Sequence, residues 1–547
     1  MALTKAHNRM IEGASVNVKD YGATGDGVTD DTAAIQAAMD ASTGTVFIPS
    51  GTYKCTSTVE FKGDVLGESG TLLKFYSSFI TKLVNKITVG NITNIAIDGA
   101  NVTDGQYGLF VDMQYAPENE VYNNVKVTNM TSATTSSNGI LVYRASSSAV
   151  YTGKLTIDDC YAKDITGSSI AKGILVAFNN DSITDVTINN CKVQNVTPAA
   201  DGDAIHISSA NYLAGTAVTA DMTYGGVVSN CYISSNVPMK RAIKIQFLNA
   251  KVINNTVIGD NISGGFDTYS PGTIFDGNTY TANASGGEVY ALRGENCSIL
   301  NTTIISEAST AICIRIEGAV NAILDNINIT YNGPAVLDLG IIDIKTGSSV
   351  TASNIDMKVG AGTCTGINVS STSTLNMSNS TIDGSYRGIY APYGSGIARL
   401  SNCKIINVVH GTSVIGATGF TYDFSDSYIQ ATSVAFYNTW SGHIAKTLLN
   451  NCVIDTLNHG CLLGAGGVDN VVQNCTITNT AGTAAGTGLA IKTGDRASNN
   501  VITNFVTGIA STYTTNTIMN NNTTIGCTTG FVLTGYTAFV NVNNNSR

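Results

Sequence analysis

Four side chains in the middle of this sequence could carry acid–base chemistry: Asp203, His206, Asp267 and Glu295. Two carboxyl groups can hydrolyse a glycosidic bond when they lie about 5 Å apart for retention or about 6.5–9.5 Å apart for inversion. Histidine changes its charge near neutral pH and can act as a general base, and the chain has only 5 histidines. We therefore predict these four as the catalytic residues, with hydrolysis as the favoured reaction.

Further polar side chains are predicted to bind the substrate: Asp201, Lys244, Tyr269, Arg293, Arg315 and Glu317. A tyrosine ring can stack on a pyranose face, and basic groups on a chain with net charge −10 suggest an anionic sugar. An alternative reaction is elimination by a lyase, which needs a base and a cation that neutralises the substrate carboxylate. His206 or Lys244 would then be the base, with Arg293 and Arg315 as the cations.

Each of these residues also has an ordinary structural explanation. Scattered charges on a solvated β-face would account for Lys244 or Arg315, and Asp203 precedes a strand, where aspartate is a common turn residue. The sequence has no GxSxG motif and no histidine cluster with zinc-site spacing, so these enzyme classes are excluded. No metal and no cofactor is predicted.

The element that must position these residues is a repeat that runs through nearly the whole chain. Its kernel is Asn or Asp, two residues of any type, and an aliphatic residue. Seventeen copies begin at Asn94, Asn124, Asp159, Asn190, Asn230, Asn255, Asn278, Asn301, Asn326, Asn354, Asn379, Asn402, Asp426, Asn451, Asn474, Asn499 and Asn522. A fixed period in the twenties indicates a solenoid with one coil per repeat.

The short-range pattern decides which solenoid this is. Apolar and polar residues alternate around each kernel, which is a strand pattern, and a second strand usually begins with Gly, as at Gly139, Gly173 and Gly366. Asn at the bend tolerates a left-handed backbone, and its amide can both donate to and accept from the next coil. Short strands between Asn, Gly, Ser and Thr, with no room for helices, predict an all-β parallel β-helix.

Cysteines repeat with the same period. Six of them follow a bend residue directly: Cys160, Cys191, Cys231, Cys403, Cys452 and Cys475. Because Thr, Ser or Ile takes this place in other coils, we expect small, buried, unpaired side chains rather than metal ligands. Free cysteines suit folding in a reducing cytoplasm.

Aligning the second strands at their Gly/Ala-Ile start stacks outward residues from coil to coil, about 4.8 Å apart. His206, Lys244 and Asp267 then form one column, which places Asp203 and Asp267 about 10 Å apart. The same alignment puts Arg293, Arg315 and Lys345 in one column, with Cys313 facing outward. The longest coil, between Asn190 and Asn230, must expel a loop at residues 208–224, where function often concentrates.

Composition narrows the remaining possibilities. Only 12% of the 547 residues are charged, and no apolar run approaches the roughly 20 residues that cross a bilayer. The acidic balance argues against nucleic acid as a partner, and residues 1–14 lack the apolar core of a secretory signal. We expect a linker or neck at 1–15, a strand–helix cap at 16–60 and the parallel β-helix at 61–547, with no separate C-terminal domain.

The N-terminal cap has its own pattern. Residues 16–21 alternate as a strand, residues 22–27 form a turn-rich loop, and Thr29 or Asp30 caps a helix. The apolar face of that helix carries Ala34, Ile35, Ala38 and Met39. A helix in this place would cover the open end of the solenoid.

Residues 16–53 resemble the N-terminal signature of the pectate-lyase-like β-helix superfamily. The shared features are the Gly25-Asp26-Gly27 loop, Asp30-Asp31, the Ala34–Ala38 helix and the Pro49–Tyr53 return. Residues 8–13 resemble the neck that joins virion-anchoring heads to bacteriophage tailspikes. The run Gly202–Ile205 is similar to a polygalacturonase motif, but it lacks one acid and the family's following His, so that active site is not carried over.

The resemblance implies a right-handed, single-stranded parallel β-helix, usually a homotrimer, that binds and cleaves capsular or O-antigen polysaccharide. It implies a virion tail protein, made in the host cytoplasm and attached to the tail through its N-terminus. Two alternatives remain open at this point. One is a polysaccharide lyase on the same fold, and the other is a fibre that binds the polysaccharide without cleaving it.

Overall fold

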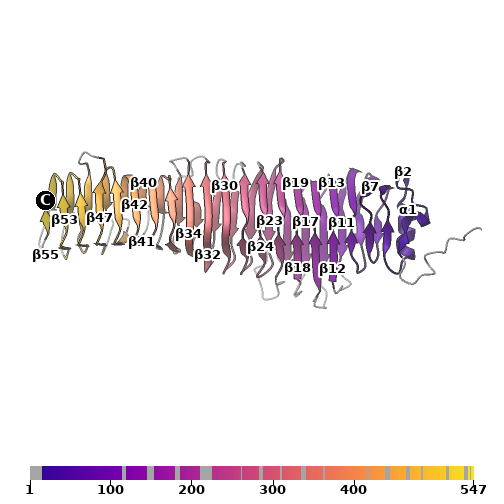
Figure 1. Cartoon of the computed structure of the whole chain (residues 1–547), viewed down its shortest axis with the longest axis horizontal. Helices are drawn as coiled ribbons and strands as arrows, with labels where there is room; N and C mark the ends of the chain where they lie inside the picture. Colours follow the sequence, from indigo (N-terminus) through magenta and orange to yellow (C-terminus); the bar gives the residue numbers. More distant parts are fainter. Residues whose placement is uncertain are drawn as a thin grey trace, which may run out of the picture. The chain divides into compact units, whose positions relative to one another are not determined.

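The computed structural model describes residues 15–113, 119–144, 153–178, 185–209, 225–259, 261–282, 287–307, 311–333, 340–360, 364–414, 418–437, 444–463, 469–481, 485–512, 516–534, 540–542 and 544–547. The chain divides into two compact units, Met1–Ala284 and Ser285–Arg547. In each unit, short strands stack coil upon coil (Figure 1). The predicted neck at residues 8–13 and most of the predicted loop at 208–224 lie outside the described residues.

Unit 1 (residues 1–284) winds through three parallel sheets, here called A, B and C. Sheet A stacks β1 (Val16–Asn17), β3 (Val46–Ile48), β6 (Val65–Gly67), β9 (Ile92–Thr93), β12 (Asn119–Asn123), β15 (Lys154–Asp158), β18 (Asp185–Asn189), β21 (Val227–Ser229), β24 (Lys251–Ile253) and β27 (Ile274–Asp276). Sheet B stacks β2 (Asp26–Asp30), β4 (Gly51–Cys55), β7 (Thr71–Ser77), β10 (Ala96–Val102), β13 (Lys126–Ser132), β16 (Tyr161–Gly167), β19 (Lys192–Pro198), β22 (Tyr232–Ser235), β25 (Thr256–Gly259) and β28 (Thr279–Ala282). Sheet C stacks β5 (Val59–Phe61), β8 (Ile80–Lys86), β11 (Gly105–Asp112), β14 (Ser137–Arg144), β17 (Ile170–Phe178), β20 (Asp201–Ser209), β23 (Met239–Ile245) and β26 (Ile262–Thr268).

Unit 2 (residues 285–547) repeats the plan, with some longer strands that bend from one sheet into the next. The strands used below are β29 (Gly287–Leu292), β31 (Ala311–Ile316), β33 (Gly340–Ile344), β34 (Ser349–Val359), β35 (Thr365–Val369), β36 (Thr374–Ser378), β39 (Ile397–Ser401) and β41 (Thr418–Ser425). Register pairs such as Ile314 with Ile342 and Ile342 with Ile367 are parallel and bury aliphatic side chains inside the coil. The predicted parallel β-helix is confirmed.

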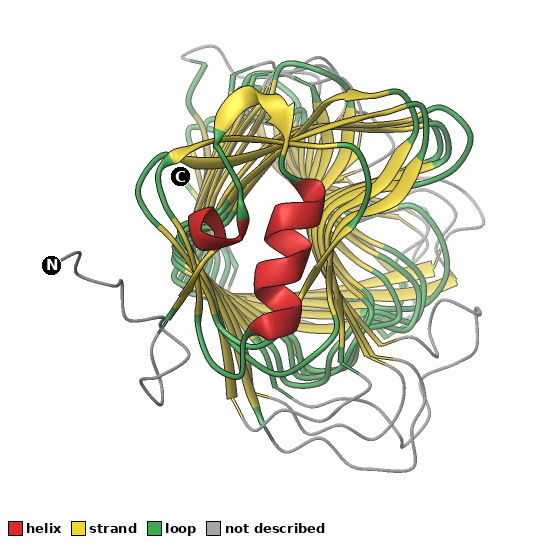
Figure 2. Cartoon of the chain, turned by 90° about the vertical axis from the view of Figure 1, so that its right-hand side faces the viewer, coloured by secondary structure: helices red, strands yellow, loops and turns green. Residues whose placement is uncertain are grey.

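The N-terminal helix is α1 (Thr32–Ala41), which buries Ile35, Ala38 and Met39. Figure 2 shows α1 lying across the open N-terminal end of unit 1, where it covers apolar core, as predicted. The helix begins one or two residues later than expected, and the Asp30 carboxylate accepts the Thr32 N–H at 3.1 Å. The predicted strand at 16–21 is cut short, because residues 18–21 form a 3-10 helix after β1.

The acidic loop before α1 serves the fold. Asp31 is fully buried and accepts hydrogen bonds from the backbone N–H groups of Thr24 and Gly25 at 2.7 and 3.1 Å. The Asp26 carboxylate accepts two further N–H groups, from Val28 and Thr29, each at 2.8 Å. These bonds satisfy the loop backbone, so the Gly-Asp-Gly motif needs no catalytic explanation.

The Asn repeat forms two ladders rather than one. At most predicted bends the kernel Asn or Asp has a left-handed backbone, and Asn124 donates to Asn94 at 2.8 Å. Asn255, Asn278 and Asn522 are exceptions, because the residue before each of them is left-handed instead. Their own side chains point inward and are buried.

The inward ladder continues the cysteine positions. The Asn255 amide accepts the N–H of Cys231 at 2.9 Å and donates to Asn278 at 3.0 Å. Cys231 therefore occupies the same inward place as Asn255, one coil away. None of the 12 cysteines, all of which are described, forms a disulfide, and burial raises the pKa of the Cys160 and Cys231 thiols. The prediction of small, inward, unpaired cysteines is confirmed.

Candidate active site

A corner in the strands of sheet C sets the direction of the candidate side chains. Ala204 and Ile205 are fully buried. Asp203, which precedes them, binds the partly exposed Arg241 and lies 3.2 Å from His206 Nδ1, so both side chains face away from the coil interior although both are buried. The corner needs a small residue, because a Cβ on Gly173 would lie 2.4 Å from Val193 Cγ1 and 2.6 Å from the Ala204 carbonyl oxygen. This crowding explains the Gly or Ala at the corner in the coils around Asp203, such as Gly173, Ala204 and Ala242.

The register in unit 1 agrees with the prediction. His206 pairs with Lys244, and Lys244 pairs with Asp267. A second column lies immediately before the corner, where Asp203 pairs with Lys172 on one side and Arg241 on the other. Parallel pairing therefore gathers two carboxylates, an imidazole and three cations on one face of β17, β20, β23 and β26.

Asp203 is the centre of this cluster. Its side chain is fully buried, Arg241 Nε donates to its Oδ1 at 2.6 Å, and Lys172 Nζ forms an ion pair with its Oδ2. His206 Nδ1 lies 3.2 Å from the same Oδ2. Although burial opposes ionisation, the His206 hydrogen bond and the charges of Lys172 and Arg241 hold the Asp203 pKa well below its usual range. Asp203 is thus a permanent carboxylate at neutral pH and cannot supply a proton as a general acid.

His206 is held neutral. Burial, followed by the charge of Lys172, lowers its pKa to about 4. Its Nε2 lies 2.9 Å from the Gln246 side-chain amide, which also contacts the Ser208 hydroxyl at 2.9 Å. The Gln246 side-chain oxygen accepts the Ser208 hydroxyl and also faces His206 Nε2. The ring is only 1% exposed and orients Asp203 rather than facing a substrate.

The groups that reach the surface of the cluster are cationic and aromatic. Lys244 is half-buried, and its Nζ lies 5.6 Å from the centroid of the Tyr269 ring. Burial and the nearby Arg241 charge lower the Lys244 pKa. Arg241 Nη1 lies 3.8 Å from the Asp267 carboxylate, so one guanidinium stands between Asp203 and Asp267. Both predicted catalytic carboxylates therefore lie beside the same guanidinium.

Asp201 lies at the rim of the cluster. Its carboxylate forms an ion pair with Arg241 and lies 3.4 Å from Lys172 and 3.5 Å from Lys240. Burial opposes its ionisation, but the charges of Lys172 and Arg241 lower its pKa. Asp201 thus helps to fix the basic side chains in place.

The predicted residues of unit 2 form a separate group. Arg293 Nη2 donates to Glu288 at 2.6 Å, and Arg315 forms an ion pair with the same carboxylate. Glu317 lies 3.6 Å from Arg293 Nε. Glu295 is exposed in the turn after β29, outside the ion pairs that join these neighbours.

The register predicted for unit 2 is wrong by two residues. Arg315 pairs with Ala291 and Asp343, not with Arg293 and Lys345. Cys313 is fully buried, because it takes the small corner position, and the preceding Ala311-Ile312 only imitates the corner sequence. As a result Asp343, which is also fully buried, is the residue that meets Arg315 at 3.6 Å and Lys345 at 3.2 Å.

Sequence reasoning missed Lys172, Arg241, Gln246 and Glu288. Lys172, Arg241 and Glu288 share one signal, since each directly precedes a corner residue. Glu288 precedes Val289 as Asp203 precedes Ala204, and each carboxylate is bound by two basic side chains. Reading one position before the corner in each coil finds these three residues, and alternation after the corner places Gln246 on the outward face, two residues after Lys244.

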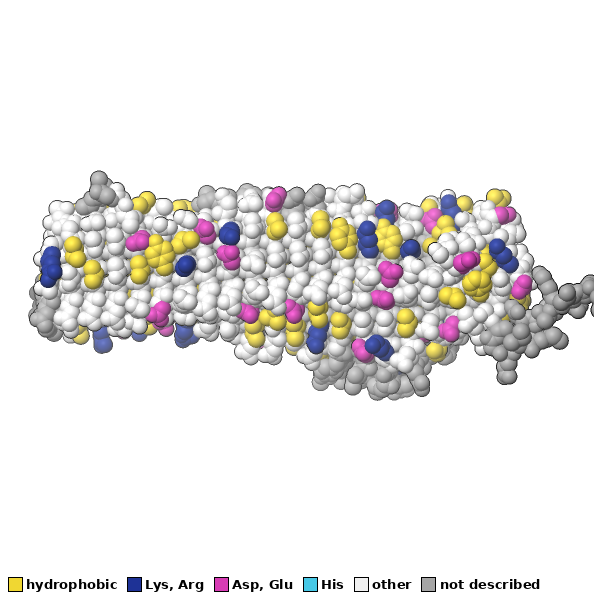
Figure 3. Space-filling model, viewed as in Figure 1, with side chains coloured by type: hydrophobic (Ala, Val, Ile, Leu, Met, Phe, Trp, Pro, Cys, Tyr) yellow, Lys and Arg dark blue, Asp and Glu magenta, His cyan; other side chains and the backbone are white. Residues whose placement is uncertain are grey.

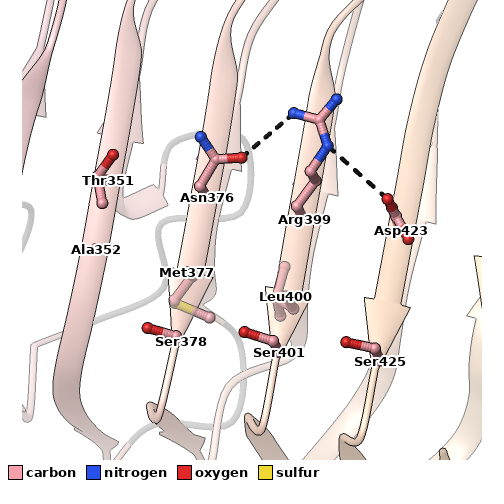
Figure 4. Close-up of a pocket in the computed structure, with 10 residues that line it drawn as sticks. All are labelled: Thr351, Ala352, Asn376, Met377, Ser378, Arg399, Leu400, Ser401, Asp423 and Ser425. Atoms are coloured by element: carbon pink, nitrogen blue, oxygen red, sulfur yellow. Dashed lines mark hydrogen bonds and ion pairs between the residues drawn. The ribbon is translucent and has the colours of Figure 1, made fainter. Parts of the chain in front are cut away.

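A shallow hollow of about 390 Å³ lies on unit 2, across β34, β36, β39 and β41. Figure 4 shows Arg399 between Asn376 and Asp423, with Ser378, Ser401 and Ser425 in a row below. Arg399 donates to Asn376 at 3.3 Å and lies 3.8 Å from Asp423. With Asp423 as its single carboxylate, the hollow lacks the pair that hydrolysis needs.

Two further searches cover only the described part of the chain. There, no group of three or more His, Cys, Asp or Glu side chains could hold a metal ion. Nor does that part contain a helix long and apolar enough to span a membrane.

Sequence comparison finds relatives that match short stretches. Alginate lyase 7 of Azotobacter vinelandii is 38% identical over 120 residues, which is 17% of this chain and 14% of the relative. Mannuronan C5-epimerase AlgE5 of the same organism is 64% identical over 42 residues, which is 7% of this chain and 4% of the relative. The chain thus spans less than a fifth of the length of either protein.

One solved structure follows the chain over most of its length. The N-terminal fragment of gene product 12 of bacteriophage phi29 is 12% identical, covers 97% of this chain and 91% of its own, and has a TM-score of 0.43. This likeness says nothing about function. Residues 15–221 match the family described as rhamnogalacturonase A/epimerase, pectate lyase-like. The match covers less than half of the chain, and the parallel coils of the structure are compatible with it.

Proposed function

We propose that this protein binds an acidic polysaccharide and cleaves it by β-elimination at the Asp203 cluster. The observation that carries the proposal is the charge state of the cluster. Asp203 is held ionised by Lys172 and Arg241, whereas the groups that reach the surface are a guanidinium, a lysine with a lowered pKa and a tyrosine. That set suits elimination better than hydrolysis, which needs a protonated carboxylic acid.

The roles follow from the chemistry of a uronic acid. Arg241 would pair with the substrate carboxylate and so make the adjacent C5 proton more acidic. The neutral amine of Lys244 would remove that proton, and the electron pair would form the C4=C5 double bond as the C4–oxygen bond breaks. Tyr269 would protonate the departing oxygen, or stack on the sugar ring. The lowered Lys244 pKa favours the neutral amine that such a base requires.

The relatives support the same substrate class, since one is named a lyase of alginate and the other an epimerase of mannuronan, both polymers of uronic acids. Hydrolysis by Asp203 and Asp267, or by Glu295, remains a prediction.

The test is incubation of the whole protein with alginate, polygalacturonate, hyaluronan and bacterial capsule preparations, followed by sizing. Shortened chains that absorb in the ultraviolet through a new double bond support elimination. Shortened chains with new reducing ends and no such absorbance would establish hydrolysis instead. Binding without shortening would leave only the non-catalytic fibre.

Lys244→Met is the informative variant. We expect it to lower the turnover at least 100-fold, within the usual range for loss of a general base, while the fold is retained. Lys251→Met is the matched control, because Lys251 is an exposed lysine on β24 of sheet A and should leave the turnover unchanged. Equal activity of the two variants would remove Lys244 from the mechanism.

We further propose that the protein works as a homotrimer on a phage tail, attached through its N-terminus. This proposal rests on the resemblance of residues 8–13 to a tailspike neck. Light scattering on the purified protein should give three times the chain mass of 56.9 kDa. A monomer mass at micromolar concentration would contradict it.

A further inference from the structure

A row of alternating lysine and tyrosine side chains runs along sheet B of unit 1. In four successive strands, β13, β16, β19 and β22, one outward column consists of Lys126, Tyr161, Lys192 and Tyr232. Figure 3 shows basic and hydrophobic side chains following one another along this face, where Figure 1 places β13 and β19. This Lys–Tyr row belongs to a different sheet from the Asp203 cluster, which lies on sheet C.

Cation–π contacts and hydrogen bonds hold part of the Lys–Tyr row in a fixed geometry. The Lys192 ammonium lies 5.8 Å from the Tyr161 ring centroid and 5.3 Å from that of Tyr232, so one cation stands between two rings. The Tyr161 hydroxyl donates to Gln194 at 2.6 Å, and the Gln194 amide donates to Ser234 at 2.8 Å. Holding rings and amides in one geometry lowers the entropy cost of binding a ligand.

A hollow of about 350 Å³ lies beside the row. Its lining combines a cation, amides, hydroxyls and one aliphatic side chain: Lys163, Gln194, Asn195, Ser234, Asn236 and Ile258. Ile258 is 43% exposed and supplies the apolar part of this lining. Polar groups around a small apolar patch match the two kinds of surface that a sugar ring presents.

The charges indicate what the row binds. Lys126 and Lys192 are exposed, and neither takes part in the ion pairs found among the described residues, although the whole chain has a net charge of −10. Two unpaired cations that alternate with aromatic rings complement a polymer with alternating carboxylates and ring faces. Contact with the same row on a second copy would instead bring lysines against lysines.

We propose that the Lys–Tyr row is a second binding surface for acidic polysaccharide, with the sugar chain lying along the axis of unit 1. Tyr161 and Tyr232 would stack on pyranose faces, while Lys126 and Lys192 pair with carboxylates. The proposal takes its ligand class from the proposed function, but it concerns binding alone and needs no cleavage.

The test is affinity electrophoresis of the whole protein in gels that contain alginate, polygalacturonate or hyaluronan, with neutral dextran for comparison. We expect retardation by at least one acidic polymer and none by dextran. Lys126→Gln with Lys192→Gln should weaken the interaction about tenfold or more, and Tyr232→Ala should weaken it several-fold without any change of charge. Because these side chains are exposed, the variants should keep the wild-type melting temperature.

The control is Lys251→Gln, which removes one exposed lysine from sheet A of the same unit and should leave the retardation unchanged. Equal migration of the wild type in all four gels would overturn the proposal, and so would equal weakening by Lys251→Gln and Lys192→Gln. Equal retardation by double-stranded DNA would overturn the assignment to polysaccharide. The readout is separate from catalysis, because Lys244→Met should still bind through the row even if it no longer cleaves.

Discussion

Replacing Asp203 with asparagine should destabilise unit 1 severely. The change is nearly isosteric, but it leaves Lys172, whose side chain is only 5% exposed, and Arg241, at 14%, without their main counter-charge. Removing one partner of a buried ion pair costs about 3–5 kcal/mol, because the other charge stays buried and uncompensated. Two cations depend on Asp203, so we expect a loss at the upper end of that range.

The pH dependence of this loss has a definite sign. The folded-state pKa of Asp203 lies well below its unfolded value, so its charge stabilises the fold at every pH above about 4. The stabilisation disappears as the pH falls through the folded pKa. The stability difference between the wild type and Asp203→Asn should therefore be full at pH 7 and shrink in strong acid.

Calorimetry or urea denaturation of both proteins measures the difference. Asp185→Asn is the matched control, since Asp185 forms an exposed pair with Lys154 at 3.7 Å, and such pairs contribute about 0–1 kcal/mol. Adding Lys172→Met to Asp203→Asn should recover part of the loss, because it removes a stranded charge. A free energy of unfolding of Asp203→Asn within about 1 kcal/mol of the wild type would refute the account of the cluster.

Three further predictions concern the coil and its protonation. Asn255→Ala should lower the free energy of unfolding by about 2–3 kcal/mol, because it leaves the buried N–H of Cys231 without its acceptor. Asn254→Gly, at a left-handed bend, should change the free energy of unfolding by under about 0.5 kcal/mol. Equal effects of the two variants in denaturation experiments would show that the inner ladder is unimportant. Gly173→Ala should lower the free energy of unfolding by about 1–3 kcal/mol, because its Cβ meets Val193 and the Ala204 carbonyl, and a neutral result would contradict the corner packing. Since the His206 pKa is lowered to about 4, its neutral form stabilises the fold above the unfolded pKa of about 6.5, and this contribution is lost as the pH falls to about 4. His206→Gln should accordingly flatten the stability profile between those two values, and an unchanged slope there would refute the assignment.

The fold could be predicted because each coil repeats the same local requirements. A bend that needs a left-handed residue selects Asn, Asp or Gly, and in unit 1 the crowded corner selects Gly or Ala at Gly173, Ala204 and Ala242. Both requirements are local, so they can be recognised in the sequence without any knowledge of tertiary contacts. The assignment of Asn255 to the bend was wrong because two Asn residues are adjacent there, and only the backbone distinguishes Asn254 from Asn255.

The candidate site was predicted less completely, because its contacts are not set by local requirements alone. The column of His206, Lys244 and Asp267 followed from the corner rule, but strict alternation hides Lys172 and Arg241, because the corner itself breaks the alternation. In unit 2 a cysteine at the corner displaced the alignment by two residues. The charge state of Asp203 depends on the burial of three neighbours, and no sequence pattern reports burial of that kind.

The buried cysteines of this protein can report the order in which its coils unfold. Eleven of the twelve thiols are sealed within the coil, and Cys527, near the C-terminus, alone is partly open to solvent. A thiol-modifying reagent should react with Cys527 first, and with each buried cysteine only when the coil that contains it unfolds. The order in which the other cysteines become labelled would therefore show whether the solenoid unwinds from one end, turn by turn, or gives way all at once.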